Sequence, residues 1–259
     1  MKKRVLTAIA IILFVLPPVA FGGWLLEALG VFIVMTGCWE WLHVMKGSDR
    51  WIWKVYIPMV LWILGLYFLP LFGIQIPTLA YWIAGLIYFW SLPVFMESFS
   101  QENCMAVLSL LLIFGVGYLA MQMLMAEHKY LWTLIFATYG SDTGAFFAGK
   151  FFGKHKMNPR ISPKKTWEGF AGGWIAGFVL SFAVSMLYSS DMNPQLNLWI
   201  CILAPVFAEL GDLCFSSYKR ALGLKDFSNL LPGHGGVLDR IDSLMMNFLL
   251  FGFLASILL

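Results

Sequence analysis

Long apolar runs separated by short polar breaks occupy almost the whole chain. A helix needs about 20 mainly apolar residues to cross a bilayer, and cutting the sequence at polar, proline and glycine breaks gives nine segments of about this length. We expect helices near Val5–Phe21, Trp24–Met45, Val55–Phe72, Pro77–Phe95, Met105–Ala126, Tyr130–Gly149, Glu168–Leu187, Leu198–Tyr218 and Val237–Leu259. The pattern therefore predicts an all-α, polytopic integral membrane protein with about nine transmembrane helices.

No long soluble stretch, low-complexity region or clear repeat interrupts this pattern. We therefore expect one membrane domain over residues 1–259, with N-terminal helices in 1–126 and the functional helices and loops in 127–259. The opening "MKKRVLTAIAIILFVLPPVAFGG" also fits a signal peptide, with its basic start and apolar run. Because no A-x-A cleavage motif follows, a retained first helix is the preferred interpretation.

Composition supports the membrane assignment. The 259 residues are 60% hydrophobic and 12% charged, with a mean hydropathy of +0.80, whereas a soluble domain carries about 25% charged residues. A large soluble protein is thereby excluded. The four cysteines stand singly in apolar surroundings without a CxxC pair, which favours packing over a disulfide or a zinc site; they are Cys38, Cys104, Cys201 and Cys214.

The positive charges fall almost entirely on one side of the predicted helices. With nine spans and a cytoplasmic N-terminus, all but one of the 17 Lys and Arg residues lie on the cytoplasmic side, and the exception is Lys129. This asymmetry agrees with the positive-inside rule. We expect a multi-pass protein of the inner (cytoplasmic) membrane, with its N-terminus and its functional face toward the cytoplasm.

One basic cluster runs from Ser141 to Gly169. Six cations lie between positions 150 and 165, namely Lys150, Lys154, Lys156, Arg160, Lys164 and Lys165. Ordinary anchoring beside anionic lipid headgroups would explain such a cluster. However, Asp142 lies within the apolar sixth segment, and "SPKKT" joins hydroxyl groups to cations, which suits a polyanionic ligand such as a triphosphate.

Acidic residues occur in pairs near the cytoplasmic ends of the last two predicted helices. Glu209 and Asp212 are three positions apart and share one helix face, and Asp239 and Asp242 have the same spacing. A charge within a span costs about 2.5–3.5 kcal/mol on insertion scales, so these acids need cationic partners. Two interpretations stay open, a salt-bridge network with the nearby lysines and arginines, or a divalent metal site.

The glycine-rich "PGHGG" precedes the last helix. Its glycines remove side chains and allow a phosphate to approach backbone N–H groups near the positive end of the helix dipole; they are Gly233, Gly235 and Gly236. His234 suits an acid/base, a phosphate donor or a turn residue. Metal ligation by histidine is not expected, because the others show no ligand spacing with it: His43, His128 and His155.

Carboxylates beside phosphate-binding cations indicate Mg²⁺, which takes one or two carboxylates and completes its shell with phosphate and water. The residues thus predict phosphoryl or nucleotidyl transfer at the cytoplasmic membrane surface, where metal and cations neutralise charge on the transferring group. The depth of the acids indicates a lipid as one substrate.

At these residues the sequence resembles the phosphatidate cytidylyltransferases, also called CDP-diacylglycerol synthases. The family pattern S-x-(aliphatic or Phe)-K-R-x4-K-D-x-(small)-x2-(apolar)-P-x-H-G-G-(apolar)-x-D-R-(apolar)-D is matched from Ser216 to Asp242. Tyr218 departs from this pattern. Phe215 and Phe146 also stand where Glu and Tyr are common, but no charged or glycine position of the pattern is lost.

A second family block, D-(S/T)-x-A…G-(R/K)…S-P-K-K-T-W-E-G, is matched by Asp142, Thr143, Ala145, Gly149, Lys150 and the stretch from Ser162 to Gly169. The two blocks cover the C-terminal half, and the earlier segments match the family only in hydropathy.

The resemblance implies that CTP and phosphatidic acid give CDP-diacylglycerol and pyrophosphate with Mg²⁺ as cofactor. It implies metal binding by Asp212 and Asp239. The implied catalytic residues are Lys219, Arg220, Lys225, Asp226, His234, Arg240 and Asp242. The implied substrate-binding residues are Asp142, Ser162, Lys164, Lys165, Ser216, Gly235 and Gly236.

The family also implies a homodimer, whereas the Gly169/Gly173/Gly177 ridge suits close packing within one chain. No nucleic-acid partner is expected. Alternatives are a paralogue with another lipid acceptor or nucleotide, a non-catalytic lipid-binding relative, and a transporter. A transporter predicts acids throughout the membrane depth, but here they gather at one face, apart from Glu40 and a few loop acids.

Overall fold

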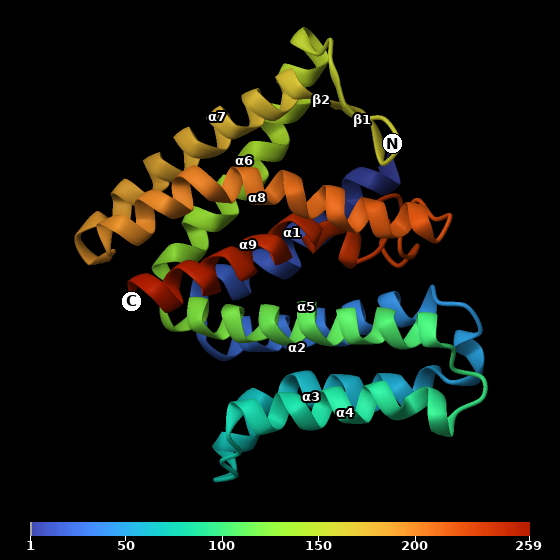
Figure 1. Ribbon diagram of the computed structural model, residues 1–259. Coiled ribbons are helices and arrows are strands. Elements are labelled where there is room, and N and C mark those ends of the chain that lie inside the picture. The colour runs from blue at the N-terminus through green and yellow to red at the C-terminus, as the bar shows by residue number, and fades with distance from the viewer. Residues whose placement is uncertain (1) are drawn as a thin grey trace. The chain divides into compact units, whose positions relative to one another are not determined.

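The computed structural model describes residues 2–259, and helices dominate that range (Figure 1). The elements are α1 (Lys2–Phe21), α2 (Gly23–His43), the 3₁₀ helix η1 (Ser48–Arg50), α3 (Ile52–Leu71), α4 (Thr78–Phe95), α5 (Gln101–Ala126), α6 (Lys129–Phe152), β1 (Lys156–Asn158), β2 (Ser162–Thr166), α7 (Trp167–Ser185), the 3₁₀ helix η2 (Met186–Asp191), α8 (Pro194–Ala221) and α9 (Leu238–Leu258). Each of the nine predicted segments coincides with one of the α-helices in residues 2–259, which confirms the all-α, polytopic prediction.

Seven of these helices are long and apolar enough to cross a membrane within the described range, all except α1 and α6. The apolar part of α1, Val5–Phe21, falls below the usual length. The sequence of α6 contains Asp142 and several Gly, Ser and Thr residues, which lower its hydropathy. The protein is a multi-pass membrane protein, and the number of nine crossings stays a prediction, as does the cytoplasmic N-terminus.

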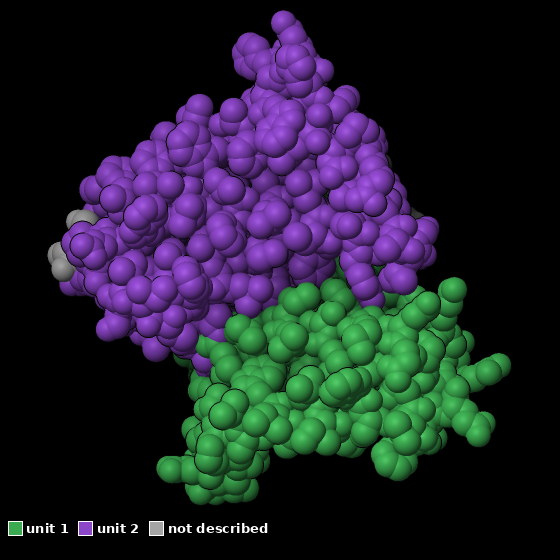
Figure 2. Space-filling model, viewed as in Figure 1, with its two compact units in different colours: residues 1–119, 227–238 green, residues 120–226, 239–259 purple. Residues whose placement is uncertain are grey.

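The chain forms two compact units, coloured separately in Figure 2. Unit 1 comprises Met1–Leu119 and Phe227–Leu238, and unit 2 comprises Ala120–Asp226 and Asp239–Leu259. The first thus combines the N-terminal helices with the glycine-rich segment, and the second contains strands β1 and β2 and the acidic residues of α8 and α9. The single membrane domain over residues 1–259 stays a prediction.

Aromatic residues join helices and connecting segments within unit 1. The ring of Trp51 packs edge-on against Phe99 with centroids 4.8 Å apart. The Trp41 indole donates to the Ala106 carbonyl at 3.2 Å, so that α2 is tied to α5. A Cβ on Gly37 would lie 2.6 Å from the Phe114 ring, so this contact requires glycine.

Unit 2 depends on the close approach of glycine-bearing helices. A Cβ on Gly173 of α7 would lie 2.8 Å from the Ser141 carbonyl oxygen, and one on Gly177 would lie 2.7 Å from the Ala137 carbonyl oxygen, both in α6. Small residues allow such backbone contact between membrane helices. The glycine ridge of α7 therefore packs within one chain, as the sequence analysis preferred.

A short antiparallel hairpin between α6 and α7 was not predicted. Strands β1 and β2 pair Lys156 with Thr166 and Asn158 with Ser162, with an irregularity between the two pairs. These strands are too short and too polar for an alternating apolar pattern to reveal them. The hairpin places the "SPKKT" residues on β2, directly before α7.

We predict that Gly173→Val lowers the stability of the folded protein, because its side chain would overlap the Ser141 carbonyl. Overpacking of this kind costs about 1–3 kcal/mol. The measurement is the midpoint of thermal unfolding in detergent. Val179→Leu is the control, since Val179 lies on the same helix and is 54% exposed. Equal midpoints for the two variants would contradict the packing argument.

Candidate active site

The basic hairpin is anchored at both ends by hydrogen bonds to the start of α7. Thr166 ends β2, and its hydroxyl accepts from the backbone N–H of Gly169 at 3.1 Å, which caps the helix. At the other end, the Glu168 carboxylate accepts from the Lys154 N–H at 3.0 Å and contacts the His155 Nδ1 at 2.6 Å. The two anchors fix the strand that carries Lys164 and Lys165.

Lys165 reaches from β2 to two acids on α8. Its ammonium nitrogen lies 2.5 Å from Glu209 Oε2 and 2.5 Å from Asp212 Oδ2. The Glu209 side chain is only 5% exposed, so its charge needs this partner. Burial lowers the pKa of Lys165, but attraction by Asp212 and Glu209 outweighs burial, and the pKa lies above its usual value. We call these three residues the Lys165 cluster.

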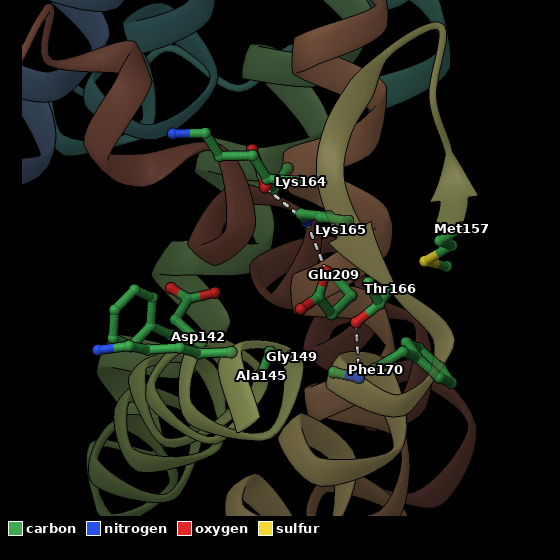
Figure 3. Close-up of a pocket in the computed structure, with 13 residues that line it drawn as sticks. Asp142, Ala145, Gly149, Met157, Lys164, Lys165, Thr166, Phe170 and Glu209 are labelled. Atoms are coloured by element: carbon green, nitrogen blue, oxygen red, sulfur yellow. Dashed lines mark hydrogen bonds and ion pairs between the residues drawn. The ribbon is translucent and has the colours of Figure 1, made fainter. Parts of the chain in front are cut away.

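A cavity of about 400 Å³ opens beside the Lys165 cluster (Figure 3). The charged residues that line it are Asp142, Lys150, Lys164, Lys165, Glu209 and Asp212. The apolar residues that line it include Phe146, Met157 and Phe170. A cavity lined by both lysines and aromatic rings suits a ligand that joins phosphates to a flat organic group.

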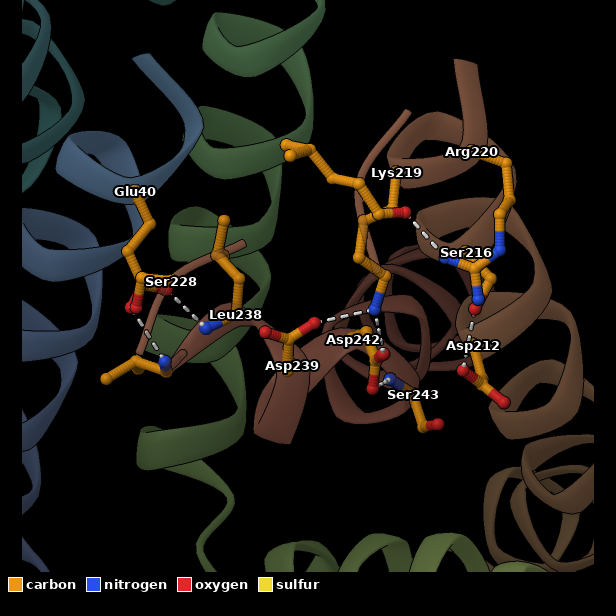
Figure 4. Close-up of polar contacts among 12 residues, drawn as sticks. Glu40, Asp212, Ser216, Lys219, Arg220, Ser228, Leu238, Asp239, Asp242 and Ser243 are labelled. Carbon is orange, nitrogen blue, oxygen red and sulfur yellow. Dashed lines mark hydrogen bonds and ion pairs between the residues drawn. The ribbon is translucent and has the colours of Figure 1, made fainter. Parts of the chain in front are cut away.

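A second lysine pairs with the acids at the start of α9 (Figure 4). Lys219 of α8 has its ammonium 2.6 Å from Asp239 Oδ1 and 3.9 Å from Asp242 Oδ2. The side chains of Lys219 and Asp239 are 7% and 2% exposed, so this pair is buried. We call these three residues the Lys219 cluster. Salt bridges thus account for both acid pairs that the sequence pointed to.

Close packing of α8 on α9 brings this cluster together. A Cβ on Gly211 would lie 2.7 Å from the Asp242 carbonyl oxygen. One turn further along α8, the Ser216 hydroxyl donates to Asp212 Oδ1 at 3.3 Å. Ser216 therefore supports Asp212, the acid that also belongs to the Lys165 cluster.

The remaining predicted residues of unit 2 lie on its surface or in the hairpin. Arg220 donates to the Leu224 carbonyl at 2.6 Å and so closes the end of α8. Ser162 opens β2. Lys225, Asp226 and Arg240 have exposed side chains, and so does Asp142, which also lines the cavity.

The glycine-rich segment lies in unit 1, where an unexpected acid binds it (Figure 4). Glu40 of α2 accepts hydrogen bonds from the Ser228 hydroxyl at 2.6 Å, the Val237 N–H at 2.9 Å and the Leu238 N–H at 2.8 Å. A Cβ on Gly236 would lie 2.5 Å from a Glu40 oxygen. The carboxylate of Glu40 thus takes up N–H groups of the kind that the sequence analysis assigned to a substrate phosphate.

The turn before these residues also needs glycine. Gly233 and Gly235 have φ angles of 79° and 85°, which side chains disfavour. The Leu231 N–H donates to the Gly235 carbonyl at 2.8 Å, and the His234 N–H donates to the Leu231 carbonyl at 2.8 Å. Tight turning therefore explains two of the three glycines, and substrate binding by Gly235 and Gly236 stays a prediction.

The carboxylates of unit 2 suit Mg²⁺ by their chemistry. In residues 2–259, no three His, Cys, Asp or Glu side chains gather into a metal-binding group. A magnesium ion needs only one or two protein carboxylates when phosphate and water complete its shell. Asp212 is partly exposed and lines the cavity. This donor set fits the ion, and the assignment to Asp212 and Asp239 stays a prediction.

Three features of this region were not predicted from the sequence. Glu209 was noted as an acid but not placed in the site, and the lining of the cavity by Phe146 and Phe170 was not predicted. Glu40 stood out only as a charge within an apolar segment, the signal that marks a residue with an interior partner. Its partner was not predictable, because 197 positions separate it from Val237.

Fold and site together define a multi-pass membrane protein whose lysine- and carboxylate-lined cavity suits a phosphate-bearing ligand. The model of the cytidylyltransferase family matches residues 2–258. The chain therefore belongs to the cytidylyltransferase family, which confirms the resemblance and extends it over the N-terminal half.

Proteins named phosphatidate cytidylyltransferase are similar over nearly the full length. Those of Staphylococcus epidermidis and Staphylococcus aureus are 33% and 34% identical over 252 and 253 residues. That of Staphylococcus haemolyticus is 32% identical over 256 residues. In each case the alignment covers 95% of this chain and 95% of the relative.

We predict that Lys165→Met destabilises the protein by about 3–5 kcal/mol, because it leaves Glu209 buried without a cation. Adding Glu209→Gln to this variant should restore part of the loss. Chemical denaturation in detergent measures the effect, with the exposed Lys164→Met as control. A Lys165→Met variant as stable as the control would contradict the assigned pairing.

Wild type and Lys165→Met should also differ in how their stability depends on pH. Because the folded state raises the Lys165 pKa above 10.5, its contribution is complete below that pH and is lost as pH rises through the folded-state pKa. The stability difference between wild type and Lys165→Met should stay constant between about pH 7 and 9 and shrink above about pH 10.5. A difference that falls steadily across the neutral range would indicate that another group is responsible.

Proposed function

We propose that this protein transfers the cytidylyl group of CTP to phosphatidic acid, giving CDP-diacylglycerol and pyrophosphate. An oxygen of the lipid phosphate attacks the α-phosphorus of CTP and forms a new P–O bond. The bond from that phosphorus to the oxygen bridging to the β-phosphate breaks, and pyrophosphate leaves with the electron pair. The protein is thus a nucleotidyltransferase of phospholipid biosynthesis.

The observation that carries this proposal is the cavity beside the Lys165 cluster in a chain whose family match covers residues 2–258. Lys164 and Lys165 line the cavity and supply positive charge, and Phe146 and Phe170 supply flat apolar surfaces. Phosphate transfer requires charge neutralisation and positioning more than covalent help from the protein.

The residues of the site divide by their surroundings. Lys164, Lys165 and Ser162 hold CTP phosphates from the hairpin, with Asp142 opposite them in the cavity wall. The acceptor phosphate and the departing pyrophosphate are neutralised by the family-pattern cations: Lys219, Arg220, Lys225 and Arg240. Asp226, Asp242 and Ser216 orient these cations and Asp212. His234 is a further catalytic residue in this proposal, and Gly235 and Gly236 bind substrate by letting a phosphate approach the backbone. No general base is required, because a phosphate monoester oxygen is already ionised at neutral pH.

Mg²⁺ is the proposed cofactor, held by Asp212 and Asp239. When bound, the ion supplies positive charge that offsets the charge of the transferring and leaving phosphates. Lys165 and Lys219 neutralise these two acids before substrate arrives.

The lipid substrate agrees with the depth of the site in a multi-pass membrane protein. We place the protein in the inner membrane, with the N-terminus, the basic cluster from Ser141 to Gly169, the loop from Lys219 to Gly236 and the cavity at the cytoplasmic side, where CTP is available. The positive-inside distribution of Lys and Arg supports this orientation. We propose CTP and phosphatidic acid as the substrates and expect no nucleic acid to bind.

We predict that purified protein in mixed micelles moves label from [α-³²P]CTP into lipid when phosphatidic acid and Mg²⁺ are present. EDTA should abolish the transfer. Asp239→Asn should reduce turnover at least about 100-fold, because it removes a charge at the reacting phosphates. Thermal midpoints of both proteins check folding, since Asp239 also pairs with Lys219.

Lys129→Gln is the matched control for this experiment. Lys129 lies at the other end of α6, where it pairs with Glu127 at 3.0 Å, and its loss should leave turnover unchanged. A large loss of turnover there would contradict the proposed orientation. Label transfer to a polyprenyl phosphate, but not to phosphatidic acid, would identify a family member with a different acceptor.

We also propose that the protein works as a homodimer. The glycine ridge of α7 is occupied by α6 and α8 in the same chain, so a dimer uses another helix surface. Light scattering in detergent should give a protein mass of twice 29.3 kDa. A mass of one chain in active protein would rule the dimer out as a requirement.

A further inference from the structure

Glu40 is a buried carboxylate that the proposed reaction leaves without a role. It lies in the apolar helix α2 and is 2% exposed. A charge in such a position is expensive unless polar partners surround it. Glu40 therefore requires hydrogen-bond donors around its carboxylate.

The carboxylate collects three donors from one segment of the chain. Ser228 and the Val237 N–H both donate to Oε1, and the Leu238 N–H donates to Oε2. Leu238 is the first residue of α9, so two of the donors are backbone groups at a helix N-terminus. An anion at this place satisfies N–H groups that have no partner within the helix, and it interacts favourably with the helix dipole.

Other contacts in unit 1 hold the same segment against α2. The Phe227 ring stacks on Trp41 with centroids 6.0 Å apart. The Leu231–Gly235 bridge folds the residues between them into a tight turn. Glu40 is the charged member of this arrangement, and it binds the residues that immediately precede Asp239.

We propose that Glu40 is a positioning residue for the cytidylyl transfer. It fixes the backbone of Gly236, Val237 and Leu238, and thereby sets where α9 begins and how its first turn presents Asp239. This inference rests on the proposed function for its catalytic meaning, while the anchoring itself is testable without any activity.

The geometry explains why a nearly isosteric replacement should fail. Glutamine keeps one acceptor oxygen but presents an NH₂ group where the second oxygen accepts, so one backbone N–H would face another donor. Displacement of a reacting group by about 1 Å costs about 100-fold in rate. Because Lys164 and Lys165 belong to the hairpin, binding of CTP should change little.

The first experiment compares Glu40→Gln with Glu27→Gln. Glu27 lies on the same helix, about 20 Å along it from Glu40, and accepts from the Tyr67 hydroxyl at 2.5 Å. We expect kcat of Glu40→Gln to fall about 100-fold, with KM for CTP within about twofold. The lost hydrogen bond should also lower the thermal midpoint, so kcat is compared at a temperature where both proteins are fully folded. Glu27→Gln should behave as wild type. The proposal would be overturned if kcat of Glu40→Gln were unchanged, or if only KM for CTP changed.

A double-mutant cycle tests the contact directly and does not depend on Glu40→Gln folding well. Gly236→Ala should lower kcat at least about tenfold in the wild-type background, because its Cβ meets the carboxylate. In a Glu40→Ala background the same change should add little, since the obstructing group is gone. Additive effects of the two substitutions would overturn the assigned contact.

Hydrogen exchange separates this inference from the proposed function. The amides of Val237 and Leu238 should lose protection in Glu40→Gln and keep it in Glu27→Gln. If wild type transfers no label from CTP, the proposed function fails, and the amide protection alone then decides whether Glu40 anchors the segment. Unchanged protection in Glu40→Gln overturns the anchoring whatever the activity.

Discussion

Pairing of buried carboxylates with specific donors is the constraint on which the polar part of this structure depends. The apolar helices leave little water to solvate a charge, so each acid requires a partner that the fold must bring to it. Lys165 serves Glu209 and Asp212, and Lys219 serves Asp239 and Asp242. The positions of β2, α8 and α9 within unit 2 follow from these contacts as much as from apolar packing.

Close backbone approach at glycine residues accompanies these pairs in unit 2. Gly211 lets α8 touch the α9 backbone next to Asp242, and Gly173 and Gly177 bring α7 against α6. In a membrane, where apolar burial between helices provides little driving force, close contact of small residues stabilises the packing. At Gly211 the two effects meet, because the close approach of α8 to α9 lies next to Asp242, an acid that pairs with Lys219.

Hydropathy alone predicted where the helices lie, because a bilayer imposes both a length and an apolar composition on them. The i, i+3 spacing of Asp239 and Asp242 was likewise enough to predict a shared helix face. The sequence did not reveal which lysine meets which acid, nor the hairpin that carries Lys165. Both depend on contacts between distant positions, such as Lys165 and Glu209, which are 44 positions apart. The periodicity of apolar residues predicts local secondary structure and does not predict which distant residues pair.

Glu40 and Lys165 are both charged residues with polar or oppositely charged partners. In Glu40 these partners stabilise the fold, and in Lys165 they hold a cation at the proposed site. Glu40 is enclosed, and its three donors come from the protein's own chain, so no phosphate is needed to satisfy them. Lys165 lies at a cavity, and its raised pKa keeps it charged at neutral pH. In the proposed reaction, substrate phosphates meet a cation that is already held in place by carboxylates. The protein thus avoids most of the reorganisation that the same charges would undergo in water, which is the physical basis of electrostatic catalysis.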